Sequence, residues 1–366
     1  MQGRLFDRDR PVTQLHFGGG TPTYFDDSQL EQLMYHLGQA FSFAAAGERE
    51  FSIEVDPRTV DQQRLRRLVD QGFNRISLGV QDIDPAVQKA VNRIQDPELT
   101  LGMIRDSHAL GFDSVSVDLI YGLPLQTISS FTRTLEVILT ARPDRLAIYN
   151  YAHLPQVFRS QRMINAADIP SPQTKLELMA LTIDKLTGEG YVYIGMDHFA
   201  LPDDELCRAQ VEGHLQRNFQ GYSTRSECDL VGLGVSAISK VGDSFAQNYK
   251  KISQWQDAVD LGELPMWRGV SLSQEDRLRG AVIDAIMCRD RVEFAEFEHR
   301  FKIDFNDYFA LELHKLRQLA DDGLADISED GITLTAEGRL LMRAIAMVFD
   351  EYLHSASDQP RHSRVI

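Results

Sequence analysis

Short runs of β-branched, aromatic and aliphatic residues recur through the first half of the chain, each followed by a segment whose apolar residues have helical spacing. Residues 61–71 show this spacing, since Leu65, Leu68 and Val69 share one face of a helix. Strands separated by a single helix run parallel, so the pattern predicts a curled barrel or an open doubly wound sheet. The runs that predict strands are residues 12–17, 50–55, 74–80, 114–120 and 145–149.

The β/α alternation loosens after Tyr151, where we expect a helix over 172–186, a strand over 191–195 and then an irregular region. Further on, the pattern predicts consecutive helices, one beginning at Ser273, and a hairpin around Asp330-Gly331 typical of a winged helix. The sequence thus predicts three parts: a β/α part over 1–200, a substrate-facing extension over 201–263 and a mostly helical domain over 264–366.

The composition disfavours several classes of function and location. The 366-residue chain has a formal net charge of −16, which disfavours binding to nucleic acid or anionic membranes. It shows no signal peptide and no membrane-spanning run, so we expect a cytoplasmic protein. Its three cysteines, Cys207, Cys228 and Cys288, are odd in number and far apart, so their spacing predicts neither a disulfide framework nor a local metal motif.

Polar residues occur near the carboxyl ends of several predicted strands. Glycines 18–20 follow the first strand, where they allow either a tight turn or close approach of a ligand to the backbone. Glu54 and Asp56 share one face of the second strand, while Gln81 and Asp118 occupy similar places in later strands. Each alone is as consistent with a structural salt bridge as with function, but together they favour a site at the strand ends.

Other candidates are less specific. Arg93 has the pattern of a solvated helix residue, and Asp197 with His198 is either an acid–base pair, a metal site or a structural contact. Arg217 and Tyr222 are suited to binding a carboxylate and stacking on a planar ring, although loop solvation explains them equally well.

Taken together, four motifs resemble the oxygen-independent coproporphyrinogen III oxidases, radical S-adenosylmethionine enzymes of heme biosynthesis. The motif at 15–24 is shared with several relatives, whereas those at 150–155, 195–200 and 217–222 are more specific. The resemblance, from about Gln14 to Ile366, implies an incomplete barrel of six parallel strands with a helical C-terminal domain. It also implies a [4Fe–4S] cluster on a Cys-x3-Cys-x2-Cys loop, and reduction of S-adenosylmethionine to a 5′-deoxyadenosyl radical by a donor such as flavodoxin or ferredoxin.

By the same resemblance, the substrate is coproporphyrinogen III, and two of its propionates become vinyl groups to give protoporphyrinogen IX. Two S-adenosylmethionine molecules are implied, but no catalytic residue and no metal ligand is assigned. Arg217 is our candidate for a substrate propionate. The positions that match the family's cofactor contacts are Gly19, Glu54 and Ile238 for the cluster-bound molecule, and Gly20, Thr21, Gln81, Arg93, Asp118 and Ala152 for the second.

The sequence departs from the family pattern at its start, because it begins just before the second strand of the family barrel and lacks the cysteine motif. We therefore expect a (β/α)6 barrel without its first strand, and an inactive monomer that is a fragment or a mis-started gene model rather than a true cluster-less relative. The alternatives are a heme-chaperone relative, a cluster-less porphyrin- or heme-binding protein, and a barrel lyase with a divalent metal on Glu54, Asp118 and His198.

Overall fold

The computed structural model describes residues 2–354, which pack as two compact units. The sheet unit comprises Gln2–Tyr193 and Asp197–Asp204, and the C-terminal unit comprises Ile194–Met196 and residues 205–354. The end of the predicted third part, residues 355–366, lies outside the described residues. The predicted boundaries after residues 200 and 263 stay a prediction.

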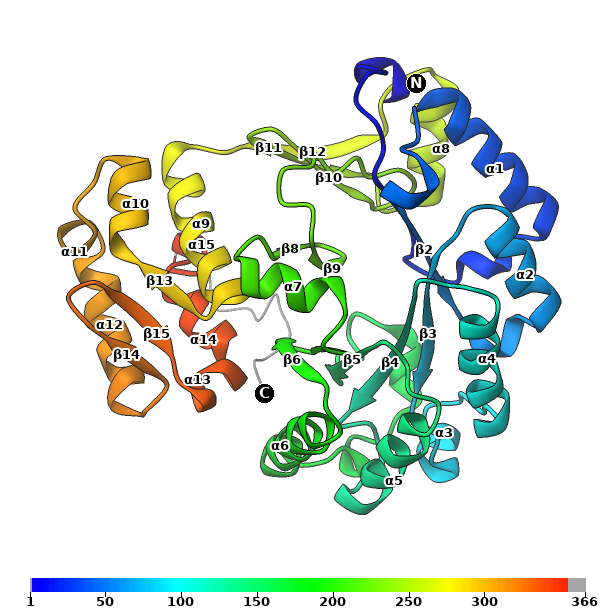
Figure 1. The fold of residues 1–366 in the computed structure, drawn as a ribbon, viewed down its shortest axis with the longest axis horizontal. Helices are drawn as coiled ribbons and strands as arrows, with labels where there is room; N and C mark the ends of the chain where they lie inside the picture. The colour runs from blue at the N-terminus through cyan, green and yellow to red at the C-terminus, as the bar shows by residue number, and fades with distance from the viewer. Residues whose placement is uncertain (1, 355–366) are drawn as a thin grey trace. The chain divides into compact units, whose positions relative to one another are not determined.

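The sheet unit has the β/α order that the sequence predicts, and a seven-stranded sheet runs through it in the order β1-β2-β3-β4-β5-β7-β6. Strands β2 to β6 of this sheet are labelled in Figure 1. The strands of the sheet unit are β1 (Gln14–Phe17), β2 (Glu50–Val55), β3 (Arg75–Gln81), β4 (Ser114–Tyr121), β5 (Arg145–Asn150), β6 (Val192–Gly195) and β7 (His198–Ala200). Its α-helices are α1 (Asp27–Ala40), α2 (Gln62–Asp70), α3 (Pro85–Ala90), α4 (Pro97–Ala109), α5 (Ile128–Leu139) and α6 (Pro172–Gly188).

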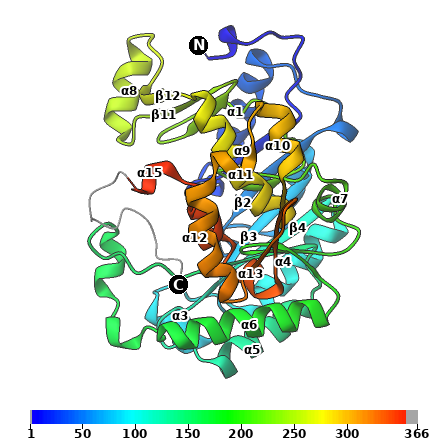
Figure 2. The same ribbon diagram turned by 90° about the vertical axis from the view of Figure 1, so that its left-hand side faces the viewer.

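Neighbouring strands from β1 to β5 pair in parallel, as expected for strands joined by helices. Helices α2 and α4 pack together on one side of these strands, and α6 lies beside α5 (Figures 1 and 2). Burial alternates along the strands: in β2, Phe51, Ile53 and Val55 are buried in the main hydrophobic core, whereas the residues between them are only partly buried. The alternation therefore places the apolar side chains on one face of the sheet and Glu54 on the other.

The sheet differs from the expected six parallel strands at one edge. Strand β7 lies between β5 and β6 and pairs antiparallel with β5, although the sequence predicted an irregular region directly after residue 195. The change of direction follows from the two residues that end β6 and begin the turn, because Gly195 has φ +141° and Met196 has φ +50°. These backbone conformations let the chain fold back as a tight turn.

The C-terminal unit contains helices and three small sheets, with β8 and β9 forming a hairpin, and orders β10-β11-β12 and β13-β15-β14 in the other two. Its α-helices are α7 (Glu205–Glu212), α8 (Ile252–Asp260), α9 (Gln274–Arg289), α10 (Phe294–Phe301), α11 (Phe305–Tyr308), α12 (Ala310–Asp321), α13 (Ala336–Leu340), α14 (Met342–Met347) and α15 (Glu351–His354). Its strands are β8 (Gln216–Asn218), β9 (Gly221–Ser223), β10 (Ile238–Val241), β11 (Ser244–Asn248), β12 (Met266–Ser271), β13 (Arg291–Glu293), β14 (Ala325–Ile327) and β15 (Gly331–Leu334).

The helix expected at Ser273 and the hairpin expected around residue 330 are both confirmed. Ser273 caps α9 in a reciprocal capping box with Asp276, which satisfies backbone donors that the first turn of a helix leaves free. Strands β14 and β15 form the hairpin, and β13 adds a third strand that the sequence pattern did not indicate. None of the helices in the described part of the chain combines the length and apolar character that a membrane span requires.

Candidate cofactor site at the strand ends

Glu54 lies on β2 and is held by two groups from the end of β1. The backbone N–H of Gly19 donates to Glu54 Oε2 at 3.2 Å, and His16 Nε2 lies 3.3 Å from Oε1. Burial alone would raise the pKa of Glu54, but the hydrogen bond and charge of His16, together with the Gly19 N–H, outweigh it and lower the pKa. Glu54 is therefore ionised at neutral pH, and its side chain is 39% exposed.

The glycine turn after β1 leaves open space beside this carboxylate. Gly19 has φ +79° and Gly20 has φ +141°, conformations that residues with a side chain rarely adopt. A Cβ at either glycine would meet no atom within 4 Å, whereas one at Gly18 would lie 2.6 Å from Glu54 Oε1. The turn thus has room for a ligand along its backbone at Gly19 and Gly20. Thr21 follows them and caps a 3-10 helix with its backbone.

Arg93 comes from the loop after α3 and points back to the ends of β2 and β3. Its Nη2 donates to the carbonyl oxygen of Gly79 at 2.6 Å, and its Nη1 lies 3.3 Å from Asp56 Oδ2. Burial is the main cause of its lowered pKa, and its Nε is buried without a hydrogen-bond partner. Arg93 is therefore not the solvated helix charge that its local sequence favoured. Gln81 lies close by at the end of β3, with a left-handed φ of +70°.

Asp118 occupies the same face on β4, and the hydroxyl of Ser77 on β3 donates to its Oδ1 at 3.0 Å. Burial raises the pKa of Asp118 to about 7, and the negative charge of Glu54 adds to this effect, while Ser77 and His16 act against it. The strand ends therefore hold one ionised carboxylate, Glu54, and one that binds a proton near neutral pH. Opposite environments for two neighbouring carboxyl groups are common at functional sites.

The raised pKa of Asp118 predicts a specific pH dependence of stability. From the ordinary value of 3.8 up to about 7, the folded protein keeps a proton that the unfolded chain releases, so this group makes stability fall as pH rises. Asp118→Asn removes the effect while retaining the oxygen that accepts from Ser77. We expect the variant to gain about 4 kcal/mol relative to the wild type between pH 4 and pH 8. Urea unfolding of both proteins at the two pH values measures the gain. The same difference in the free energy of unfolding between variant and wild type at pH 4 and at pH 8 would contradict the prediction.

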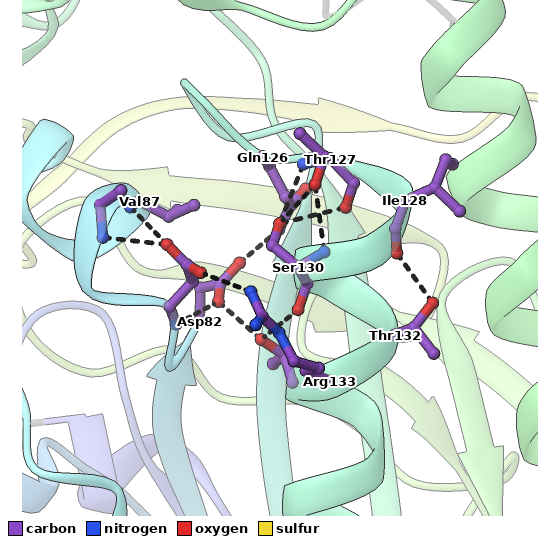
Figure 3. A network of polar contacts seen from close by, with 11 residues as sticks. Asp82, Val87, Gln126, Thr127, Ile128, Ser130, Thr132 and Arg133 are labelled. Atoms are coloured by element: carbon purple, nitrogen blue, oxygen red, sulfur yellow. Dashed lines mark hydrogen bonds and ion pairs between the residues drawn. The ribbon is translucent and has the colours of Figure 1, made fainter.

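A buried polar network fixes the loops that follow β3 and β4 (Figure 3). Asp82, 2% exposed, comes directly after Gln81 and accepts hydrogen bonds from the Thr134 hydroxyl at 2.7 Å, the Asp84 N–H at 2.8 Å and the Gln126 amide. Gln126 also accepts from the N–H of Gly122, the residue that follows β4. The network therefore ties the left-handed residue Gln81 to the end of the neighbouring strand.

The structure brings together seven of the nine predicted cofactor contacts at the carboxyl ends of β1 to β4 or in the loops that follow: Gly19, Gly20, Thr21, Glu54, Gln81, Arg93 and Asp118. Ala152 lies in the corresponding loop after β5, where its carbonyl oxygen accepts from Gln161 at 3.0 Å. Ile238 begins β10 and Arg217 lies within β8, both in the C-terminal unit, so their placement beside the other residues stays a prediction.

Three residues that bear on the site were not among the sequence candidates: His16, Ser77 and Asp82. His16 and Ser77 lie on the polar face of their strands, so period-two alternation contained a signal for them. Asp82 gave no such signal, because its partners Gln126 and Thr134 are distant in sequence. The divalent-metal alternative is wrong for the part of the chain that the structure describes, since no three His, Cys, Asp or Glu side chains gather there as a metal site, Glu54, Asp118 and His198 included.

Comparison with known proteins places this geometry in a class. Residues 3–138 match the family model of the radical SAM superfamily, and residues 272–341 match that of the HemN C-terminal domain. The chain is thus a radical SAM protein with a second characteristic domain.

The particular family follows from closer relatives. The chain is 50% identical to the oxygen-independent coproporphyrinogen III oxidase of Pseudomonas aeruginosa, over 99% of this chain and 79% of that protein. The Escherichia coli protein of the same name is also 50% identical, over 98% and 78%. The solved structure of coproporphyrinogen III oxidase from Escherichia coli, described as a radical SAM enzyme, superposes with a TM-score of 0.93 at 49% identity, covering 96% of this chain and 80% of that one. This chain belongs to the oxygen-independent coproporphyrinogen III oxidase family.

Radical SAM membership implies S-adenosylmethionine and a [4Fe–4S] cluster, and the residues present fit only the first. The unhindered Gly19 and Gly20, the ionised Glu54 and the partnerless Arg93 Nε suit a ligand that carries both positive charge and acceptor atoms. A cluster needs neighbouring thiolates. Cys207 and Cys288 are buried, Cys228 is exposed, and no metal-binding group includes any of them in residues 2–354. These cysteines do not fit the cluster.

Proposed function

We propose that this chain holds the S-adenosylmethionine and substrate sites for the oxygen-independent oxidative decarboxylation of coproporphyrinogen III to protoporphyrinogen IX. The observation that carries the proposal is the set of polar groups that gather along the parallel strands β1 to β4: Gly19 follows β1, Glu54 lies on β2, Asp118 lies on β4, and Arg93 reaches the ends of β2 and β3 from the loop after α3. This edge of a parallel sheet is where α/β enzymes bind their ligands.

Each of these groups has a distinct task in the proposal. The ionised carboxylate of Glu54 attracts the positive charge of one S-adenosylmethionine molecule, and the glycine turn lets the ligand approach the backbone. Arg93 offers its free Nε to an acceptor atom of a second molecule, while Asp118 accepts from, or donates to, a hydroxyl of it. When bound, S-adenosylmethionine supplies the group that removes hydrogen from the substrate propionates.

The proposal assigns ligand binding to this chain. It does not assign complete turnover to the 366-residue chain alone, because the cysteines of this chain do not fit the cluster. It includes an electron donor of flavodoxin or ferredoxin type, a monomeric state and a cytoplasmic location, in keeping with the acidic composition.

The test is the number of S-adenosylmethionine molecules that the purified chain binds in isothermal titration calorimetry. We expect two per chain, and Arg93→Gln should weaken one of them by roughly 10-fold or more, since it removes a charged donor from a partly buried site. Arg133→Gln, on the exposed side of α5, is the matched control and should leave both unchanged.

Two results would count against the proposal. Binding of no S-adenosylmethionine by a folded wild-type chain would overturn the cofactor site, and together with tight binding of heme it would favour a cluster-less porphyrin-binding protein. If the Arg93→Gln variant still binds two S-adenosylmethionine molecules with wild-type affinity, Arg93 is not part of the second site.

A further inference from the structure

The C-terminal unit contains a cavity of about 260 Å³ between the β8–β9 hairpin, α9 and α14, with no role in the cofactor site. It lies below the roughly 300–1,000 Å³ range of pockets that enclose a whole small ligand, so it has room for part of a larger one. Apolar and charged side chains both line it, including Met196, Met287, Met347, Arg217, Arg343 and Asp284. This combination is typical of a binding site, with an apolar wall and a few convergent polar groups.

Arg217 enters this cavity from β8 with spare hydrogen-bonding capacity. Its Nε is buried and has no hydrogen-bond partner, and its guanidinium carbon lies 5.8 Å from the centre of the Tyr222 ring. The Tyr222 hydroxyl donates to the carbonyl oxygen of Met287 on α9 at 2.8 Å, which fixes the ring against the helix. An unsatisfied buried donor on a rigid support is costly without a ligand, and a carboxylate is the group that best matches a guanidinium.

Asp284 presents the complementary group from α9. The residue is exposed where it lines the cavity, and the described residues give its carboxyl group neither a hydrogen bond nor an ion pair. Desolvation by the surrounding groups raises its pKa, while the positive charges of Lys240, Arg289 and Arg300 act against this. The carboxyl oxygens of Asp284 are therefore available to accept a hydrogen bond from a ligand in the cavity.

We propose that this cavity binds one pyrrole ring of the substrate porphyrinogen, with its N–H donating to Asp284 and its propionate bound by Arg217. The proposal rests on the proposed function for the identity of the substrate. Arg343 is available for the same propionate, since the described residues give its side chain no ion pair, and the methionines cover the faces of the ring. Thioether side chains suit this task because they are polarisable and adapt to aromatic surfaces.

This arrangement distinguishes a porphyrinogen from a porphyrin. All four nitrogens of a porphyrinogen carry hydrogen and can donate, whereas two of the four in a free-base porphyrin are acceptors only. Asp284 therefore selects the reduced ring system, and Arg217 recognises the propionate that both forms share.

The test measures binding of coproporphyrinogen III, kept reduced under anaerobic conditions, and of coproporphyrin III to the purified chain. We expect Asp284→Asn to weaken coproporphyrinogen binding roughly 10-fold and coproporphyrin binding much less, which removes the preference for the reduced form. Arg217→Gln should weaken both roughly 10-fold, and Arg217→Lys should restore part of the loss. Asp321→Asn and Arg317→Gln, exposed on α12, are the matched controls and should bind like the wild type.

Unfolding curves and S-adenosylmethionine titration of each variant separate a binding defect from a folding defect. If Asp284→Asn is folded and keeps the wild-type preference for coproporphyrinogen, the proposed contact is wrong although the proposed function stands. If the folded wild type binds S-adenosylmethionine but neither tetrapyrrole, the substrate part of the proposed function fails, and this inference with it.

Discussion

Replacing Glu54 with Gln is expected to weaken S-adenosylmethionine binding by roughly 30-fold, the largest effect of any single change at the strand ends. The Glu54 carboxylate is ionised because His16 and the Gly19 N–H lower its pKa against the effect of burial. Gln keeps the length of the side chain and an acceptor for Gly19, but it removes the negative charge that attracts the ligand's positive charge. Hydrogen bonds to charged groups contribute about 1.5–3 kcal/mol, which corresponds to this loss of affinity.

Glu50 offers a matched control for this experiment, because it lies on the same face of β2 at the other end of the strand. It pairs with Gln14 at 2.8 Å and Arg75 at 3.6 Å, far from the glycine turn. Glu50→Gln should lower stability slightly and leave S-adenosylmethionine binding unchanged. Calorimetric titration of both variants gives the comparison, and equal affinities for the two would show that Glu54 is a structural residue.

Replacing Asp82 with Ala is expected to lower the free energy of unfolding by about 3 kcal/mol. The substitution leaves three donors without their acceptor in a buried environment, namely the Thr134 hydroxyl, the Gln126 amide and the Asp84 N–H. It should also weaken the second S-adenosylmethionine site, because Asp82 fixes the loop that begins at the left-handed residue Gln81. Urea unfolding and calorimetric titration report the two effects separately.

Asp84→Ala is the comparison for Asp82, since Asp84 caps α3 through the N–H groups of Ala86 and Val87. Loss of a helix cap costs about 1 kcal/mol, so this variant should be clearly more stable than Asp82→Ala and should bind S-adenosylmethionine normally. If Asp82→Ala loses no more free energy of unfolding than Asp84→Ala, water satisfies the hydrogen-bond donors that Asp82 normally binds.

The β/α alternation, the capped helix at Ser273 and the polar residues at strand ends were all predictable from the sequence. In each case the signal is local: apolar spacing determines which strand face is buried, and a side chain two or three residues away supplies a cap. The specific motifs also indicated the family that the comparisons show.

The tertiary structure alone decided which of these residues touch. Arg93 has the sequence pattern of a solvated residue, yet packing carries it to Gly79 and Asp56. Asp118 acquires its raised pKa from burial and from the charge of Glu54, which lies on another strand. The same holds for Asp82 and for the cavity of Arg217 and Asp284. Local sequence sets the conformation of each element, whereas burial and contacts between residues distant in sequence set the electrostatic environment of each side chain.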